Sequence, residues 1–442
     1  MGGIASPGRN AGTRWSNWAG NQRAAAREAL APGSTDAVAA AVRAARDGGR
    51  RIKPVGSGHS FTDIARSDDQ RLELTRLAGP VAVDRARRRV TVQAGMPLHA
   101  LNELLAAHGL ALPNLGDIDA QTVAGAISTG THGTGAAYGC LATFVEALTL
   151  VTGAGDVLRC SADSHPEVFA AARVGLGALG VIVEVTLRCV DAFWLRADER
   201  PAPLAAVLAD LPATVEANDH LEFYWFPYTD RTQVKVNNRV PADDRPLPRL
   251  RRWLDDEFLA NTVFAGACRI GRALPRAVPT ISAVSARALT ARTYTARSDK
   301  VFCTPRRVRF IEMEYGLPRA VLPEALTGLR RIVERLPCKV LFPVEVRFTA
   351  PDDIWLSHGY GRESAYIAIH QYVGAPYEPY FRAFEQVAAA LGGRPHWGKL
   401  HYRDAGSLRA AYPRFDDFLA VRDRLDPARV FANAYTERVL GP

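Results

Sequence analysis

Three glycine-rich segments constrain the fold of this chain more than any other feature of its sequence. They cover residues 55–60, 128–135 and 175–182, and all three lie within the first 190 residues. Successive backbone N–H groups in such turns form concavities that bind anions. Glycine also lets the main chain approach a ligand closely. Three of these turns together indicate one large phosphate-bearing ligand that lies across several loops.

The sequence does not fit the common nucleotide-binding fingerprints. GLGALG at 175–180 reads G-x-G-x-x-G, but it precedes a predicted strand at 181–187 and opens no helix. The Walker pattern is missing as well. If the ligand is a nucleotide, another architecture must hold it.

The order of predicted elements favours an α+β fold. The first part contains a helix, three strands, a helix, a hairpin, and a helix–turn–strand segment, at 36–49, 51–56, 71–77, 88–95, 97–109, 146–160 and 165–190. This order lacks the strict alternation of a doubly wound fold. Ser34 or Thr35 is expected to cap the first helix.

The pattern of the sequence changes after residue 190. Alternating, aromatic-rich strands are predicted at 221–228, 308–317, 340–350 and 365–373, with helices at 323–336 and 379–391 between them. Residues 241–300 are basic, rich in proline and expected to be partly helical. We therefore predict two domains, 1–190 and 191–442, and expect the last ~30 residues to pack back on the first domain.

Composition limits the class of protein. The net charge of +9 comes from scattered arginines, and the dense runs at 85–89 and 247–253 carry no interleaved aromatic residues, which argues against nucleic-acid binding. The six cysteines show neither metal-ligand nor disulfide spacing, which suits a reducing compartment. The N-terminus lacks a signal-peptide core, and no apolar run reaches the ~18 residues of a membrane span. We expect a cytoplasmic protein without a metal, for which peripheral membrane contact stays open.

Six motifs resemble one family in order and position along nearly the whole chain. They are SNWAG at 16–20, VGSGHSFTDIA at 55–65, TVAGAISTGTHGTG at 122–135, GLGALGVI at 175–182, EVR at 345–347 and HWGK at 396–399. Together they resemble the L-gulono-1,4-lactone and D-arabinono-1,4-lactone oxidases and dehydrogenases of the vanillyl-alcohol-oxidase superfamily, with alditol oxidases as close relatives. The resemblance implies an FAD-binding domain of the PCMH type, followed by a substrate (cap) domain on a mixed or antiparallel sheet flanked by helices.

The resemblance implies FAD, attached covalently to His59 through the 8α-methyl group of the flavin. A neutral imidazole can act as the nucleophile in such a bond; the alternative is a histidine that only hydrogen-bonds near a non-covalent cofactor. We expect His132 to be a structural residue of a flavin-contacting loop, and Cys140 to be a small buried residue. The expected cofactor-binding residues are Val55, Gly56, Ser57, Gly58, His59, Ser60, Gly116, Thr122, Gly125, Ser128, Gly130, Thr131, His132, Gly133, Gly180, Val181 and Ile182.

Candidate substrate-binding residues lie in the second half of the chain. Glu345 and Arg347 alternate on a predicted strand and therefore point to the same side; a buried structural ion pair is the alternative. The resemblance implies that both line the substrate pocket together with Lys399. Cationic donors there would stabilise the alkoxide that develops during oxidation of an alcohol. His370, on another apolar strand, is either a pocket residue and proton acceptor or a structural histidine.

The pair Gly116-Asp117 separates two branches of the family. Alditol oxidases carry a small residue followed by serine in the matching loop, so Asp117 favours a lactone substrate and joins the catalytic candidates. In the family, a small residue at the Gly116 position is associated with access of oxygen to the flavin. We predict FAD-dependent oxidation of an aldono-1,4-lactone at C2, with oxygen, cytochrome c or a dye as electron acceptor. The alternatives are alditol oxidation and a non-catalytic flavin- or sugar-binding protein.

Overall fold

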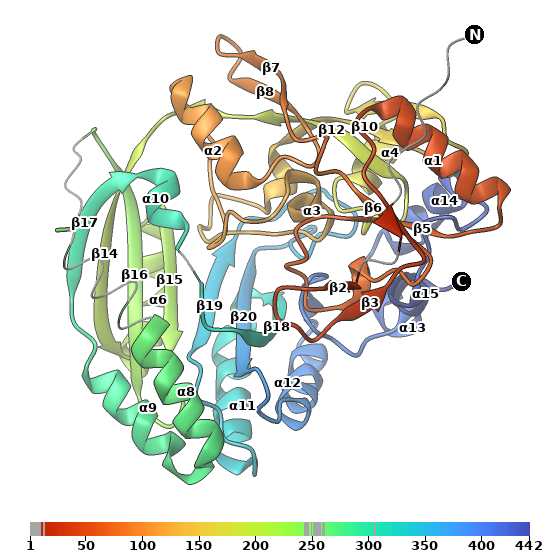
Figure 1. Cartoon of the computed structure of the whole chain (residues 1–442). Coiled ribbons are helices and arrows are strands. Elements are labelled where there is room, and N and C mark those ends of the chain that lie inside the picture. Colours follow the sequence, from red (N-terminus) through yellow and green to blue (C-terminus); the bar gives the residue numbers. More distant parts are fainter. Residues whose placement is uncertain are drawn as a thin grey trace, which may run out of the picture.

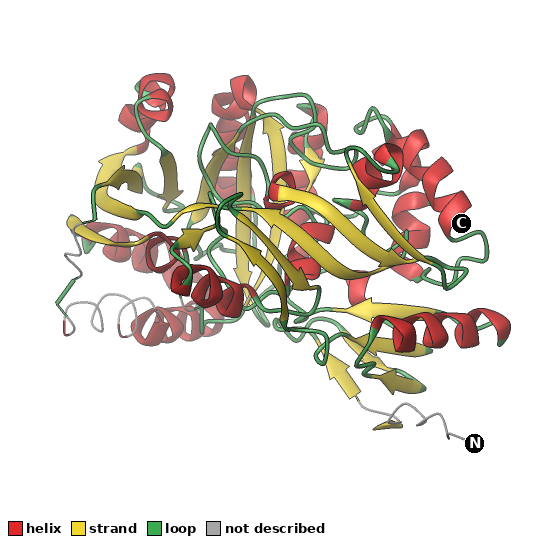
Figure 2. Cartoon of the chain, turned by 90° about the horizontal axis from the view of Figure 1, so that it is seen from above, coloured by secondary structure: helices red, strands yellow, loops and turns green. Residues whose placement is uncertain are grey.

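The structure is a computed structural model (Figure 1), which describes residues 10–11, 14–242, 247–248, 250, 258, 261–304 and 306–442. Most of the basic run at 247–253 and part of the predicted helical region 241–300 lie outside these residues. The other basic run, at 85–89, forms an exposed turn. Strands fill the centre of the molecule, and many of the helices lie at its periphery (Figure 2).

A small sheet opens the N-terminal half. Its strand order is β1-β4-β6-β5, in which β4, β6 and β5 are parallel and β1 is antiparallel. The strands are β1 (Asn10–Ala11), β4 (Glu28–Leu30), β5 (Ile52–Val55) and β6 (Gln70–Glu73). Helix α1 (Thr35–Asp47) packs its apolar face on this sheet, and the Ser34 side chain accepts a hydrogen bond from the Ala37 amide at 3.1 Å. Ser34 is therefore the helix cap.

A second sheet of the N-terminal half is antiparallel, in the order β11-β10-β12-β8-β7. Its strands are β7 (Pro80–Asp84), β8 (Arg89–Gln93), β10 (Val145–Val151), β11 (Val157–Ser161) and β12 (Val181–Arg188). Helix α4 ends before the turn at 175–180 and β12 begins after it, as predicted. The remaining elements are β2 (Arg14–Ser16), β3 (Arg23–Ala25), η1 (Asp63–Ala65), α2 (Leu98–Ala107), β9 (Leu110–Ala111), α3 (Val123–Ser128), η2 (Leu141–Phe144), α4 (Pro166–Ala172) and β13 (Val190–Asp191).

The C-terminal half is built on an antiparallel sheet in the order β17-β14-β16-β15-β19-β20-β18-β21 (Figure 1). The α+β prediction is confirmed. β19 is shorter than the predicted strand at 340–350, because Pro343 has no N–H to donate to a neighbouring strand. The strands are β14 (Trp194–Pro203), β15 (His220–Trp225), β16 (Arg231–Val240), β17 (Arg292–Arg297), β18 (Phe310–Pro318), β19 (Val344–Thr349), β20 (Ser364–Tyr372) and β21 (Arg394–Pro395).

The two faces of this sheet differ in chemistry because side chains alternate along each strand. On β18, Ile311 and Met313 enter the apolar core beneath α11 (Leu322–Arg335) and α12 (Glu378–Ala390). Glu312 and Glu314 point to the opposite face. Further helical elements are α5 (Leu204–Ala209), α6 (Leu211–Glu216), α8 (Phe264–Ala273), η4 (Pro275–Ala277), α9 (Val278–Arg287), α10 (Ser298–Phe302) and η5 (Arg319–Val321).

The C-terminal residues pack against the N-terminal half. Phe418, Tyr435 and Val439 belong to the same apolar core as helices α2, α3 and α4. The Ile52 amide donates to the Val430 carbonyl at 2.8 Å. The helices involved are α13 (Ala405–Arg409), α14 (Phe415–Leu425) and α15 (Ala434–Leu440). Among all helices that the structure describes, none is both long enough and apolar enough to cross a bilayer.

Candidate functional site

The polar face of the C-terminal sheet borders a cavity of about 1300 Å³ that both halves of the chain line. The N-terminal half contributes His59, Asp117 and His132, among others. The C-terminal half contributes residues from β15, β18, β19 and β20 and from the HWGK segment. All five candidate catalytic residues line this one cavity: Asp117, Glu345, Arg347, His370 and Lys399.

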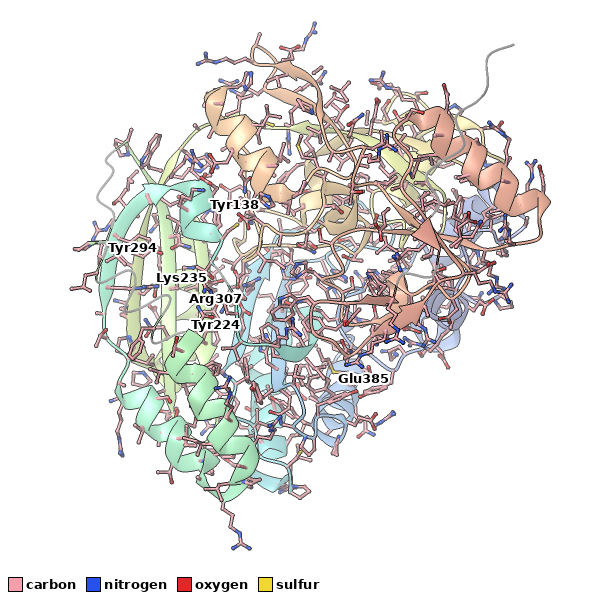
Figure 3. All side chains as sticks on the ribbon, in the orientation of Figure 1. Tyr138, Tyr224, Lys235, Tyr294, Arg307 and Glu385 are labelled. Atoms are coloured by element: carbon pink, nitrogen blue, oxygen red, sulfur yellow. The ribbon has the colours of Figure 1, made fainter. Side chains whose placement is uncertain are left out.

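Arg347 lies at the centre of a buried charge network. The register of the antiparallel pair β15–β19 places Glu222 opposite Arg347 and Tyr224 opposite Glu345. The Arg347 guanidinium forms ion pairs with Asp117 and Glu345, and its Nε lies 3.2 Å from Glu222. The Tyr224 hydroxyl donates to Glu345 at 2.9 Å. Figure 3 labels Tyr224 in this region of the sheet.

Two further cations balance the carboxylates around Arg347. Arg306 pairs with Asp117 at 2.7 Å, and Lys235, labelled in Figure 3, pairs with Glu222 at 3.1 Å. Burial opposes ionisation of Asp117, but Arg347 and Arg306 outweigh it and hold the pKa of this carboxyl well below its usual range. Glu345 has no second cation of this kind within hydrogen-bond distance among the described residues.

Glu345 differs from its neighbours in its protonation. Burial raises the pKa of Glu345 to about 7, and Arg347 offsets this effect only in part because Asp117 and Glu222 add negative charge nearby. Burial also opposes the charge of Arg347, yet the same carboxylates raise the pKa of its guanidinium further above its usual value. Near neutral pH the site thus holds a permanent cation beside a carboxyl that can gain or lose a proton.

A second charged group lies further along the same face. Lys399 Nζ contacts Glu312 at 2.5 Å, and His370 Nε2 lies 3.6 Å from the other oxygen of that carboxylate. Burial disfavours the charge on Glu312, but Lys399 and His370 lower its pKa to about 2. His370 Nδ1 lies 3.3 Å from the Pro343 carbonyl, which fixes the ring when this nitrogen carries its proton.

The HWGK segment contacts the loop that carries His59. The Phe61 amide donates to the Gly398 carbonyl at 2.7 Å, and Lys399 Nζ lies 5.2 Å from the centre of the Phe61 ring. His59 stacks on Trp18 with 6.0 Å between ring centres. Burial and then the charge of Lys399 lower the pKa of His59, so its imidazole is neutral near pH 7. Two motifs that are 340 residues apart in the sequence therefore form one wall of the cavity.

The three glycine-rich segments converge beside this wall. The Leu176 amide donates to the Ser128 carbonyl at 3.1 Å, and Lys53 Nζ donates to the Gly177 carbonyl at 3.2 Å. A Cβ atom on Gly56 would lie 2.6 Å from Oγ1 of Thr122, the N-cap of α3, so the absence of a side chain at Gly56 lets the first segment approach the helix that leads into the second. Gly58, Gly130 and Gly180 have φ angles of +70°, +72° and +156°, which side chains rarely adopt.

The cradle fits a dinucleotide cofactor. Within the described part of the chain, no hydrogen bond engages the amide N–H groups of Ser57, Gly58, His59 and Ser60. Unpaired backbone donors of this kind suit a pyrophosphate. Of the other expected cofactor residues, Gly116, Thr131 and His132 line the cavity, whereas Val181 lies in the apolar core.

His132 and Cys140 both lie in the interior. His132 stacks on Tyr366 with 3.7 Å between ring centres, and its Nε2 lies 3.3 Å from Glu314. Cys140 is 2% exposed, and burial raises the pKa of its thiol to about 12, so the thiol stays neutral. This environment matches a small buried residue.

Several residues of the site escaped the sequence-based prediction. They are Tyr224, Arg306, Glu312 and Glu314, which line the cavity, and Glu222, which contacts Arg347. The sequence does contain a signal for Glu312 and Glu314. Two glutamates that alternate within the apolar strand at 308–317 resemble the alternation of Glu345 and Arg347, and the same argument would have found them.

Comparison with known proteins identifies the class. Residues 26–161 match the family described as "FAD binding domain", and residues 185–439 match the family described as "D-arabinono-1,4-lactone oxidase". With the cavity and its charged strands, these matches define an FAD-linked oxidoreductase. The chain belongs to the D-arabinono-1,4-lactone oxidase family, and the predicted resemblance is confirmed.

Individual relatives extend the match over nearly the whole chain. The L-gulono-1,4-lactone dehydrogenase of Mycobacterium tuberculosis is 44% identical, with 97% of this chain and 99% of the relative covered. The L-gulonolactone oxidase of Bos taurus is 36% identical, with 97% and 98% covered. A solvent-stable cholesterol oxidase shares the fold, with a TM-score of 0.81, 21% identity and 98% of both chains covered. The names of the sequence relatives favour the lactone branch over the alditol branch.

Proposed function

We propose that the protein oxidises an aldono-1,4-lactone at C2 with FAD as its cofactor. The observation that carries this proposal is the convergence of Arg347, Lys399 and His370 on one cavity with His59. Each comes from a different element, and all four side chains border the same space. The product would be a 2-keto lactone or its ascorbate-type enediol form.

The bound FAD would supply the acceptor for the hydride that leaves the lactone carbon. Arg347 and Lys399 would donate hydrogen bonds to the alcohol oxygen, where negative charge develops as the proton leaves. His370 would take that proton at Nε2, because its Nδ1 is directed at the Pro343 carbonyl. Glu312, ionised at neutral pH because its pKa is about 2, would stabilise the resulting imidazolium from 3.6 Å.

The remaining charged residues would orient Arg347 and recognise the other hydroxyl groups of the lactone. Asp117 and Glu345 both form ion pairs with the Arg347 guanidinium, and these contacts restrict rotation of the guanidinium. Glu345 also accepts a hydrogen bond from the Tyr224 hydroxyl, so only its remaining acceptor positions are available to a substrate hydroxyl. Asp117 therefore acts in this scheme by positioning Arg347.

We also propose that His59 holds FAD covalently. Its low pKa leaves a neutral imidazole able to act as a nucleophile, and its position at the cavity wall supports the assignment. For the cellular location we propose the cytoplasm, which the free state of all six cysteines supports. Cell fractionation with an antibody against the protein tests the location, and recovery in another compartment would contradict it.

The test of the proposed function is turnover by the purified yellow protein on a panel of substrates. L-gulono-1,4-lactone and D-arabinono-1,4-lactone are compared with xylitol and sorbitol, and oxygen, cytochrome c and a dye are each supplied as acceptor. We expect a higher kcat/KM for a lactone than for either alditol, since Asp117 and its guanidinium partners replace the alditol-type serine. Preference for an alditol would refute the proposed substrate class.

A further inference from the structure

The cavity continues beyond the charged strands into an aromatic arm. We define this arm by Phe264, Ala267, Leu289, Leu341 and Phe342, which line the part of the cavity beside helices α8 and α9. Phe264 and Phe342 meet edge to face, with 4.8 Å between ring centres. Figure 1 shows α8 and α9 at the edge of the molecule, on the side away from the small parallel sheet.

A row of aromatic rings connects the arm with His59. The ring centres of His59 and Trp18 are 6.0 Å apart, those of Trp18 and Phe310 are 5.2 Å apart, and those of Phe310 and Phe342 are 5.5 Å apart. All of these residues line the cavity. The rings of the last two pairs are inclined at 69° and 58°, so the row offers apolar ring faces and edges against which another ring can pack.

The proposed substrate does not account for the arm. A sugar lactone carries hydroxyl groups around its ring, and burying them against Phe264 and Phe342 without partners would cost free energy. The arm therefore has the chemistry of a site for a second, apolar molecule.

We propose that the aromatic arm binds a para-quinone, which accepts the electrons that the enzyme removes from its substrate. This inference rests on the proposed function, because the electrons come from the lactone alcohol. Two electrons and two protons leave the alcohol, which becomes a ketone. Bound FAD would relay the electrons, and the quinone, on gaining two electrons and two protons, becomes the hydroquinone. An apolar quinone ring suits the aromatic side chains of the arm.

The outer end of the arm suits an apolar tail on the quinone. Val263 lines the cavity at the start of α8 and is 46% exposed. On the same helical pair, Ile270, Leu274 and Val284 are 53%, 62% and 59% exposed. Val263, Ala267, Ile270 and Leu274 follow one another at spacings of four, three and four residues, so they lie on one side of α8. An exposed apolar surface of this kind marks a site where an apolar partner is bound. A tailed quinone could leave its tail on this surface while its ring enters the arm.

The experiment compares two tryptophan substitutions in the holoenzyme. Ala267→Trp fills the arm, and Ala265→Trp adds the same side chain two residues away on α8, at a position that does not line the cavity. Binding of decylubiquinone to the oxidised holoenzyme is measured by equilibrium dialysis. Reoxidation by decylubiquinone is measured after anaerobic reduction by lactone, relative to each variant's own rate of reduction. Phe264→Ala, which removes an aromatic wall of the arm without adding volume, is the second variant.

We expect Ala267→Trp and Phe264→Ala to weaken quinone binding about tenfold or more, while Ala265→Trp binds like the parent protein. Equal binding by all four proteins, or no binding by the parent, would overturn the inference. Failure of the proposed function gives a different result: lactone then leaves the flavin oxidised, whereas arm-dependent binding of decylubiquinone persists. Reduction by lactone without any quinone binding refutes the arm and leaves the proposed function in place.

Discussion

Replacing Lys399 by methionine should slow the reaction far more than it weakens the fold. Lys399 contacts Glu312 at 2.5 Å and borders the cavity next to the loop of His59. Methionine keeps most of the apolar stem and removes the charge. If Lys399 stabilises negative charge on the substrate oxygen in the transition state, its loss should lower the rate of flavin reduction by about 10²–10³.

The cost in stability follows from Glu312. Lys399 and His370 hold the pKa of this buried carboxyl at about 2 instead of 4.5, and one unit corresponds to about 1.36 kcal/mol. Losing this net shift would cost about 3 kcal/mol; the remaining His370 reduces that cost, and the burial that disfavours ionised Glu312 adds to it. A depressed carboxyl pKa stabilises the fold above pH 4.5, and this contribution is lost as the pH falls toward 2. The stability difference between variant and parent should therefore be full at pH 7 and smaller at pH 3.

The assay is anaerobic stopped-flow reduction of the flavin by lactone, together with urea unfolding at pH 7 and pH 3. Lys339→Met is the matched control, because Lys339 does not line the cavity and its ammonium lies 5.7 Å from the centre of the Tyr228 ring. We expect the control to reduce its flavin at the parental rate. A Lys399→Met protein with full flavin content and parental reduction rate would show that Lys399 only balances the charge of Glu312.

Three further predictions concern other residues of the site. His59→Ala should release its FAD on acid precipitation, whereas the parent keeps its colour in the pellet; release from the parent as well would contradict the covalent bond. The pKa of Glu345 is about 7 in the folded protein and ordinarily 4.5, so ionisation of Glu345 lowers the free energy of unfolding as the pH rises from 4.5 to 7. Glu345→Gln should flatten this decline when the free energy of unfolding is measured in urea across that range. An unchanged pH profile would refute the prediction. A Cβ on Gly116 would lie 3.1 Å from the His132 carbonyl and 3.4 Å from the Thr131 methyl. Gly116→Val should therefore narrow the cavity here and slow reoxidation of the flavin by oxygen, measured by stopped flow. An increase of about 1.4 kcal/mol in the activation barrier would slow it about tenfold.

Local patterns in the sequence predicted many of the helices, strands and turns. Ser34 capped its helix, the glycine turn at 175–180 led into a strand, and alternation predicted strands after residue 190 that the structure contains. These features depend on neighbours within one element, which a single sequence displays, whereas the antiparallel sheet was expected from the resemblance. The shortened β19 shows the limit, because the apolar run at 340–343 reads as strand until the missing N–H of Pro343 is considered.

The charge network depended on contacts that no local pattern records. Glu345 and Arg347 could be placed on one face, but only the register of β15 against β19 brings Glu222 and Tyr224 opposite them. Asp117 reaches Arg347 from a loop that is more than two hundred residues away in the sequence. The raised pKa of Glu345 is a property of this assembly, since it requires burial and two neighbouring carboxylates at once.

Arg347 is a poorer probe of catalysis than Lys399 because more charged groups depend on it. Removing the guanidinium would leave Asp117 with Arg306 and Glu222 with Lys235, but Glu345 would keep only the Tyr224 hydroxyl. Leaving a buried charge unpaired typically costs about 3–5 kcal/mol, and protonation of Glu345 would relieve part of that cost. An inactive Arg347→Ala protein would therefore not separate a lost donor from a rearranged network. Lys399 has one carboxylate partner, Glu312, which keeps His370 at 3.6 Å, so removing Lys399 disturbs fewer charges than removing Arg347 and tests more directly the charge that the substrate would meet.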